Sequence, residues 1–220
     1  MPATPTPDLL DLARTLIATR RNTSPKRLHE PGPDAAQLQL LLSLAADAPD
    51  HAELTPWRFV WVPTAQRHRL GEAYAQALLD RDPQALPSQI DDAREKALRA
   101  PALLVAIVRL GPIERDGAVR DIPAAERLVS LGAAIQNLLL GAHAMGYASG
   151  LTSGQAMDAA PMRRLFALGE GEHAVCCINL GTAHAARPRA RPRPVPEAFA
   201  SVLGETEVQP WPPAPGLRTP

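Results

Sequence analysis

The chain has 220 residues, with 23 Lys and Arg, 23 Asp and Glu, and 45% hydrophobic residues. That length allows one domain with a sizeable core and excludes two large ones. The net charge of zero argues against a binder of nucleic acid or of an acidic membrane, because both need an excess of positive charge. No run reaches the roughly 18 apolar residues of a membrane span, and the first residues lack the pattern of a signal peptide. We therefore expect a cytoplasmic protein.

The first half of the chain alternates amphipathic and short apolar segments. The spacing predicts helices over 8–19, 34–46, 64–79 and 88–98, and a short strand over 58–62. In the first helix Leu9, Leu12, Ala13 and Leu16 share one face, which we expect to pack inward. Asp34 is the expected N-cap of the second helix.

The second half contains the most apolar segments. Strands are predicted over 101–108 and 173–180, a loop over 109–123, a long helix over 124–145 and a short helix over 161–168. The long helix is apolar around most of its circumference, which is typical of the centre of a domain or of a subunit interface. Leu138 and Leu139 are expected in that interface. Three strands among many helices indicate an α+β fold, a small sheet wrapped by helices.

The cysteines and histidines give no sign of a metal site. Cys176 and Cys177 are adjacent in an apolar run, so their side chains point to opposite faces of a strand and we expect two buried free thiols. The six histidines form no His-x-x-x-His pair beside an acid, and no metal is expected. The phosphate-binding loop, the dinucleotide fingerprint and the Gly-x-Ser-x-Gly elbow are also missing.

Four short motifs remain, in a fixed order along the chain. They are Arg20-Arg21-Asn22 after the first helix, Ala48-Pro49-Asp50-His51 followed by Thr55-Pro56-Trp57, the glycine-rich stretch Gly146–Gly154 after the long helix, and Leu180-Gly181-Thr182 after the last strand. In this order the sequence resembles the nitroreductase family of FMN-dependent oxidoreductases, specifically its small NAD(P)H nitroreductase branch. The resemblance covers roughly residues 8–194 and implies a mainly antiparallel sheet and a homodimer with the long central helix at its interface.

The resemblance also implies which residues hold FMN. They are Arg20, Arg21, Asn22, His51, Thr55, Leu151, Thr152, Ser153, Arg191 and Arg193. Arginine suits this cofactor because its planar fork binds phosphate through two hydrogen bonds. Asn22 stands where the family has serine, and Thr55 where glutamine is common. Because the flavin carries out the chemistry, no side chain is expected to be catalytic.

Each motif also has a purely structural interpretation. Arg20 and Arg21 suit the C-terminal end of a helix, whose dipole favours cations. His51 can cap the backbone of its loop, residues 151–153 can be a helix–strand connector, and Arg191 and Arg193 can belong to an exposed proline-rich arm. Trp57, at the start of a strand, is expected in the core rather than against the flavin.

The resemblance implies a reaction in which NADH or NADPH reduces FMN and leaves before an electron-poor small molecule, a nitroaromatic or a quinone, is reduced at the same site. Two alternatives stay open: a specialised flavin oxidase or dehydrogenase acting on a metabolite, and a cofactor-free helical interaction protein. The expected organisation is a disordered arm over 1–7, one FMN-binding domain over 8–194 and a proline-rich C-terminal arm over 195–220.

Overall fold

The computed structural model describes residues 7–183, 192–204 and 207–211. The chain divides into two units, Met1–Ala186 and Arg187–Pro220. Apart from Pro7, the expected N-terminal arm lies outside the described residues. The described part of the second unit holds the 3-10 turn η6 (Pro196–Ala198) and a hairpin of β8 (Ser201–Leu203) and β9 (Val208–Pro210).

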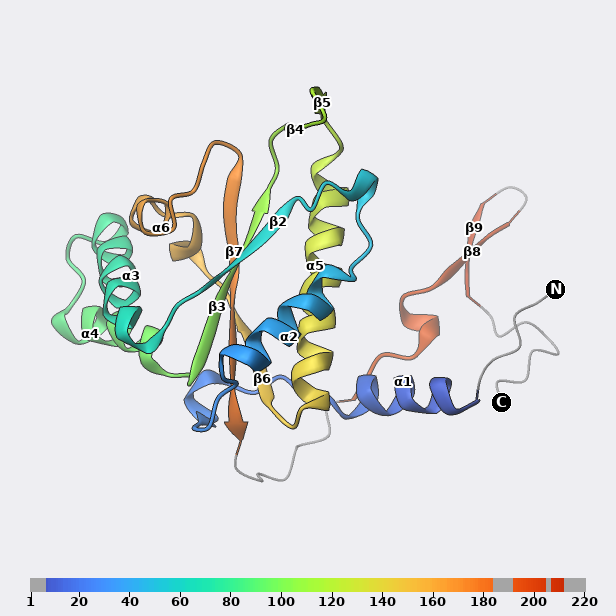
Figure 1. The fold of residues 1–220 in the computed structure, drawn as a ribbon, viewed down its shortest axis with the longest axis horizontal. Helices are drawn as coiled ribbons and strands as arrows, with labels where there is room; N and C mark the ends of the chain where they lie inside the picture. The colour runs from blue at the N-terminus through green and yellow to red at the C-terminus, as the bar shows by residue number, and fades with distance from the viewer. Residues whose placement is uncertain (1–6, 184–191, 205–206, 212–220) are drawn as a thin grey trace. The chain divides into compact units, whose positions relative to one another are not determined.

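The first unit is built on a five-stranded sheet in which every pairing is antiparallel (Figure 1). The strands run in the order β1 (Leu28–His29), β7 (Glu172–Ala183), β3 (Ala102–Arg109) and β2 (Trp57–Trp61), and β6 (Ala148–Thr152) also pairs with β7. Strands β2, β3 and β7 confirm the three predicted strands. The glycine-rich stretch predicted as a turn contains β6.

The described residues form six α-helices. They are α1 (Pro7–Thr19), α2 (Ala35–Ala46), α3 (Arg67–Arg81), α4 (Pro87–Glu95), α5 (Ala124–Ala144) and α6 (Ala160–Leu165). Asp34 caps α2 as predicted, because its Oδ1 accepts a hydrogen bond of 2.8 Å from the Gln37 backbone N. The predicted loop 109–123 contains a hairpin of β4 (Ile113–Arg115) and β5 (Ala118–Arg120), whose turn places Asp116 and Gly117 at positive φ.

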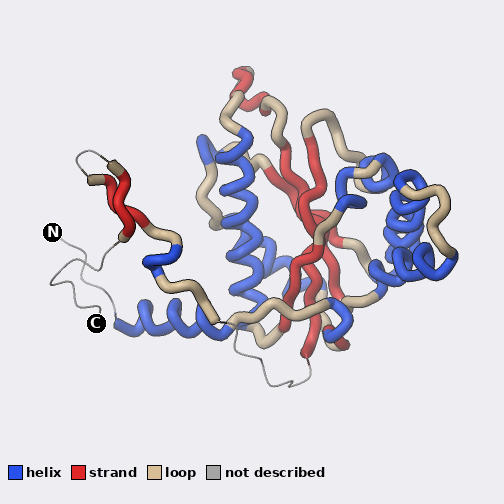
Figure 2. Tube along the Cα trace, turned by 180° about the vertical axis from the view of Figure 1, so that it is seen from behind, coloured by secondary structure: helices blue, strands red, loops and turns tan. Residues whose placement is uncertain are grey.

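Two apolar cores lie on opposite faces of the sheet, each beneath a set of helices (Figures 1 and 2). Leu104 and Ala106 face α2 and α5, whereas Leu103 and Val105 face α3 and α6, as the two-residue period of a strand requires. Cys176 and Cys177 also lie in opposite cores and both are free and buried. The sheet is therefore enclosed on both sides within one chain.

Two expectations about helix faces are wrong. Leu9 and Leu12 of α1 are 64% and 56% exposed, so the apolar face of this helix does not pack inward in the single chain. Leu138 and Leu139 are 0% and 4% exposed and lie in the core between α5 and the sheet, so they cannot face another subunit. The exposed large apolar residues of α5 are Leu128 and Val129, one turn from its N-terminal end. No helix of the described residues is both long and apolar enough to cross a membrane.

Candidate functional site

The segment that follows α1 runs parallel to β6. Asn22 forms a parallel bridge with Ser149, and the Thr23 backbone N donates a hydrogen bond of 2.8 Å to the Ser149 carbonyl. The Asn22 side-chain Oδ1 accepts a bond of 3.2 Å from the Leu151 backbone N. Within the described part of the chain, the Asn22 amide nitrogen has no hydrogen-bond partner. The first and third predicted motifs, distant in sequence, thus lie side by side.

A cavity opens at each end of this pair of segments. The smaller has a volume of about 200 Å³ and is lined by Arg20, Arg21, Gly146 and Ser149 among others. Arg20 is half-buried, while Arg21 is exposed and donates a hydrogen bond of 3.0 Å to the Arg20 carbonyl and another to the Ala18 carbonyl. The contacts of Arg21 are those expected of a cation at a helix C-terminus.

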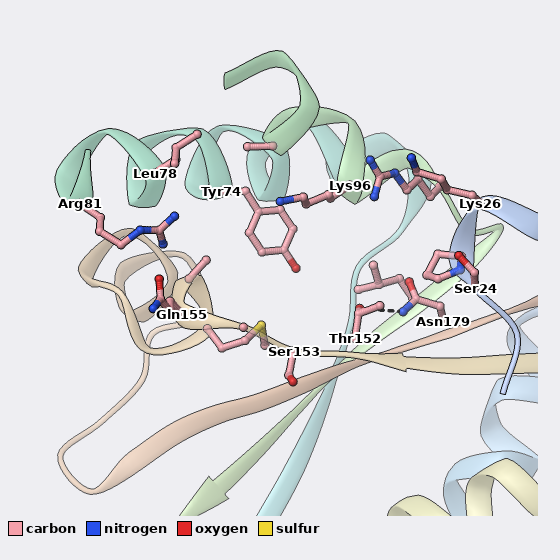
Figure 3. A pocket seen from close by; sticks show the side chains of 17 residues that line it. Ser24, Lys26, Tyr74, Leu78, Arg81, Lys96, Thr152, Ser153, Gln155 and Asn179 are labelled. Atoms are coloured by element: carbon pink, nitrogen blue, oxygen red, sulfur yellow. Dashed lines mark hydrogen bonds between the residues drawn. The ribbon is translucent and has the colours of Figure 1, made fainter. Parts of the chain in front are cut away.

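The larger cavity has a volume of about 410 Å³ and is lined by residues of α3, α4, the end of β6 and the middle of β7 (Figure 3). Two of the predicted residues, Thr152 and Ser153, line it. Asn179 is buried and its Nδ2 donates to Thr152 Oγ1 at 3.0 Å and to the Gly150 carbonyl at 3.2 Å. Asn179 therefore fixes the end of β6 on the floor of the cavity.

Several polar residues of the larger cavity were not identified from the sequence. They are Ser24, Lys26, Tyr74, Arg81, Lys96, Arg99 and Gln155. One signal was available: the chain contains only two lysines, Lys26 and Lys96, and both line this cavity. Because the two lysines are far apart in the sequence, their shared location in one cavity is visible only in the folded chain.

Two sets of polar contacts, one made by Tyr74 and one by Arg67, stabilise the cavity wall that α3 forms. Tyr74 Oη lies 3.1 Å from Cys177 Sγ, and burial raises the pKa of both groups, so the phenol and the thiol stay protonated. The guanidinium of Arg67 donates to the carbonyls of Val62, Ala97 and Pro101 at 2.6, 2.8 and 3.3 Å. Arg67 thus holds in place the turn that carries Lys96.

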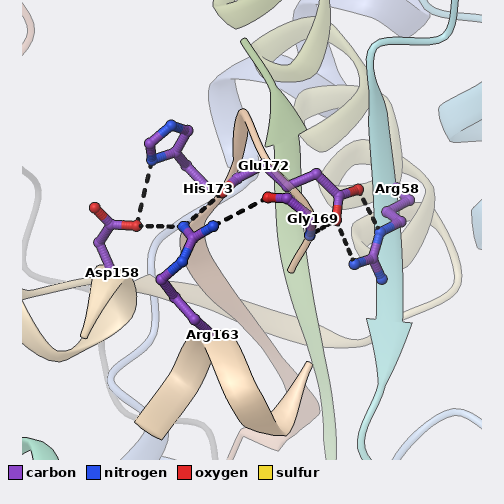
Figure 4. A network of polar contacts seen from close by, with 6 residues as sticks. All are labelled: Arg58, Asp158, Arg163, Gly169, Glu172 and His173. Carbon is purple, nitrogen blue, oxygen red and sulfur yellow. Dashed lines mark hydrogen bonds and ion pairs between the residues drawn. The ribbon is translucent and has the colours of Figure 1, made fainter. Parts of the chain in front are cut away.

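A second polar network anchors the 3-10 turn η5 (Gln155–Asp158), part of which lines the cavity (Figure 4). Asp158 lies 3.3 Å from both Arg163 and His173, and Arg163 donates to the Glu172 carbonyl at 2.8 Å. The Glu172 carboxylate accepts two hydrogen bonds from Arg58, at 2.8 and 2.9 Å. These hydrogen bonds, with that from Gly169, lower the pKa of Glu172 to about 2.

The loop with His51 and Thr55 is held by side-chain hydrogen bonds, and three of its residues have strained backbones. Ala52, Glu53 and Thr55 have φ of 54°, 53° and 44°, a left-handed conformation that is costly outside glycine. Asp50 offsets this strain, since its carboxylate accepts hydrogen bonds of 2.9 and 2.6 Å from the backbone N of Leu54 and Thr55. His51 Nδ1 lies 2.9 Å from Glu126 Oε2 in the first turn of α5.

The predicted residues form two groups at opposite ends of α5. His51 contacts Glu126 in its first turn, whereas Thr19, next to Arg20, lies 2.7 Å from His143 Nε2 in its last turn. At 1.5 Å per residue the two turns are about 25 Å apart. One chain therefore brings together Arg20, Arg21, Asn22, Leu151, Thr152 and Ser153, but not His51 and Thr55.

The remaining predicted positions lie in the second unit. Arg191 is outside the described residues, and Arg193 is exposed.

Trp57, at the start of β2, is half-buried and packs against the core beneath α5, as predicted. Its Nε1 donates a hydrogen bond of 3.1 Å to Ser130 Oγ. Among the described residues, no group of three or more His, Cys, Asp or Glu side chains is placed to hold a metal ion.

Comparison with known proteins identifies the family. The sequence profile of the Nitroreductase family matches residues 17–182. A protein of Haemophilus influenzae, named provisionally as an NAD(P)H nitroreductase, is 28% identical over 77% of this chain and 88% of its own length. The similarly named YdjA of Escherichia coli K12 is 29% identical over 77% of this chain and 87% of its own length.

Solved structures share the fold. A nitroreductase-like protein from Bacillus cereus superposes with a TM-score of 0.74, with 19% identity over 92% of this chain and 98% of that one. The FMN-dependent nitroreductase NfnB of Mycobacterium smegmatis, solved with NADPH, gives a TM-score of 0.67, with 18% identity over 90% of this chain and all of that one. The chain belongs to the nitroreductase family, which confirms the resemblance and the fold class. Membership of a family of oxidoreductases also argues against a cofactor-free interaction protein.

Proposed function

We propose that the protein binds FMN and passes hydride from NADH or NADPH to an electron-poor acceptor, a nitroaromatic or a quinone. The observation that carries the proposal is the pair of cavities joined by the parallel segments 20–26 and 148–153. Ser149 and Ser153 mark their two ends and, at 3.3 Å per residue, lie about 13 Å apart. One elongated ligand with a charged tail and an aromatic head fits this arrangement.

The donors at the two ends match the two ends of FMN. Arg20 and Arg21 line the small cavity and would hold the phosphate, for which arginine is well suited. Lys26, Lys96, Thr152 and Ser153 line the large cavity and would donate to the polar edge of the ring, while Leu103 and Met157 supply apolar contact. When bound, FMN would accept the hydride and pass it on. The side chains of the protein would therefore need only to bind, orient and polarise it.

The separation of the two groups of residues supports a homodimer with shared sites. Because His51 and Thr55 lie about 25 Å along α5 from Arg20, they would reach an FMN held by Arg20 of a second copy. Exposed apolar side chains on α1 and α5, including Leu9, Leu12 and Val129, would be covered in such a dimer. Arg191 and Arg193 are proposed to add to the phosphate site.

One and the same site would serve both substrates in turn. NAD(P)H would enter the large cavity, leave oxidised, and be followed by the acceptor, which gives ping-pong kinetics. The proposed location is the cytoplasm, which agrees with two free buried cysteines.

The visible spectrum of the purified protein, before and after incubation with FMN and desalting, tests the proposal. We expect retained flavin absorbance that NADH or NADPH bleaches without oxygen and that a nitroaromatic or a quinone restores. A protein that retains no flavin after incubation would contradict the proposal. Retained flavin that neither nicotinamide reduces would show that another donor supplies the electrons.

A further inference from the structure

The larger cavity is strongly positive within a chain of zero net charge. Its lining includes four cations, Lys26, Arg81, Lys96 and Arg99, and no aspartate or glutamate. Within the described residues none of these four side chains makes a hydrogen bond or an ion pair. A cleft lined by one sign of charge attracts ligands of the opposite sign, so the cavity favours anionic molecules.

The cations fall at different places along the cavity (Figure 3). Lys26 lies toward the end where Asn179 holds Thr152, which is the end proposed for the flavin, and the Lys96 side chain reaches toward Tyr74. Arg81 lies at the other end, beside Gln155. The proposed contacts with FMN account for the two lysines but not for Arg81, nor for Arg99, which also lines a separate cavity.

We propose that Arg81, together with Gln155, forms a subsite for an anionic group, a carboxylate or a phosphate, on the molecule that exchanges hydride with FMN in this cavity. The inference rests on the proposed function, since it names a chemical feature of the second ligand. Two sources of this group are open to the same site: the acceptor and the nicotinamide dinucleotide.

The chemistry of the neighbouring side chains fits such a ligand. A guanidinium binds a carboxylate or a phosphate through two parallel hydrogen bonds, and the Gln155 amide can donate a third. Tyr74 lies between Arg81 and Lys26 (Figure 3) and offers an aromatic surface, and Leu78 adds an aliphatic one to the cavity lining. The subsite thus suits an aromatic or heterocyclic molecule with a negative group at one end.

Arg81 has a competing structural explanation that predicts a different result. It is the last residue of α3, where a cation stabilises the helix dipole. That role would not depend on the charge of a substrate. A variant that changes the preference between charged and uncharged substrates therefore separates the two explanations.

The experiment compares the FMN-loaded wild type with Arg81→Gln in each half-reaction, using charged and uncharged versions of one reactant. The oxidative pair is 4-nitrobenzoate and 4-nitrobenzamide; the reductive series is NADPH, NADH and the phosphate-free N-benzyl dihydronicotinamide. Titration of the oxidised protein with benzoate and benzamide, followed by the flavin spectrum, measures binding without turnover. Arg69→Gln, another exposed α3 arginine that does not line the cavity, is the matched control.

We expect the wild type to prefer the charged member of at least one pair by about tenfold or more, as a charge-assisted hydrogen bond allows. Arg81→Gln should lose that preference, and Arg69→Gln should keep it. A change in the oxidative pair and in benzoate binding assigns the anion to the acceptor; a change in the reductive series alone assigns it to the dinucleotide. Equal use of charged and uncharged members, or a preference that Arg81→Gln retains, would overturn the subsite while leaving the proposed function intact. Failure of every reactant to bleach or restore the flavin would instead overturn the proposed function.

Discussion

A Cβ atom added to Gly150 would overlap the backbone carbonyl oxygen of Thr23. The absence of a side chain at this position lets the segment after α1 approach β6 closely enough for the Thr23 backbone N to donate to the Ser149 carbonyl at 2.8 Å. That contact aligns the two proposed ends of the FMN site. Gly150 therefore allows the segment after Arg20-Arg21-Asn22 to pack against the glycine-rich stretch Gly146–Gly154.

Gly150→Ala should separate these segments, because the neighbouring atoms are backbone and cannot rotate away. We expect a loss of stability of about 1–3 kcal/mol, the range for overpacking, and weaker FMN binding. Thermal unfolding and fluorescence titration with FMN measure the two effects. Gly169→Ala is the control, since its nearest contact would be at 3.8 Å. Unchanged FMN affinity in Gly150→Ala would mean that the alignment is not needed for the cofactor.

The Arg58–Glu172 ion pair should make stability depend on acid pH. The folded-state pKa of Glu172, about 2, lies below the value of about 4.3 in an unfolded chain. The stabilisation is therefore complete above that unfolded value and is lost as the pH falls toward 2. We expect Glu172→Gln to lower the free energy of unfolding by about 1–2 kcal/mol at pH 7, with a smaller difference at pH 3.

Urea unfolding at pH 7 and pH 3 checks this prediction. Glu72→Gln removes a more exposed partner of Arg94, whose ion pair measures 2.8 Å, and should change the stability little at either pH, because solvent screens an exposed pair. If Glu172→Gln lost equal stability at both pH values, the effect would come from packing and not from charge.

Val129→Lys should split the proposed dimer. Val129 is 71% exposed in the single chain, so lysine there costs little within the chain but places a charge in an apolar interface. Light scattering should show a monomer, and FMN should be lost with it. Leu86→Lys, at a site 61% exposed at the start of α4, should stay dimeric. A Val129→Lys protein that remains dimeric and yellow would remove this part of α5 from the interface.

Arg20→Ala with Arg21→Ala should weaken FMN binding. Each charge-assisted hydrogen bond contributes about 1.5–3 kcal/mol, so the dissociation constant should rise by about 100-fold or more. Arg14→Ala, an exposed arginine earlier in α1, should change it little. An equal FMN affinity in the double variant and the wild type would show that the phosphate lies elsewhere.

The sequence predicts the sheet–helix layering well because buried strands and helix faces leave strong periodic patterns. It misses β6, since Ala148–Thr152 contains Gly150, which weakens strand propensity but is required by a contact with Thr23. It also places Leu138 and Leu139 at an interface, because apolar periodicity does not distinguish packing within a chain from packing between chains. The cations of the large cavity come from the 3-10 turn η1 (Pro25–Arg27), from α3, and from the 3-10 turn η4 (Lys96–Leu98) and the residue after it. No local sequence pattern connects them.

The most direct test of the shared-site account is subunit complementation. One parent carries Arg20→Ala and Arg21→Ala, the other His51→Ala and Thr55→Ala, and differently tagged copies are co-expressed so that the mixed dimer can be purified. If each site takes Arg20 and Arg21 from one copy and His51 and Thr55 from the other, the mixed dimer has one intact site. It should then retain FMN that NAD(P)H bleaches, while both parent dimers lose most of theirs. A mixed dimer with no more flavin than its parents would contradict the shared site.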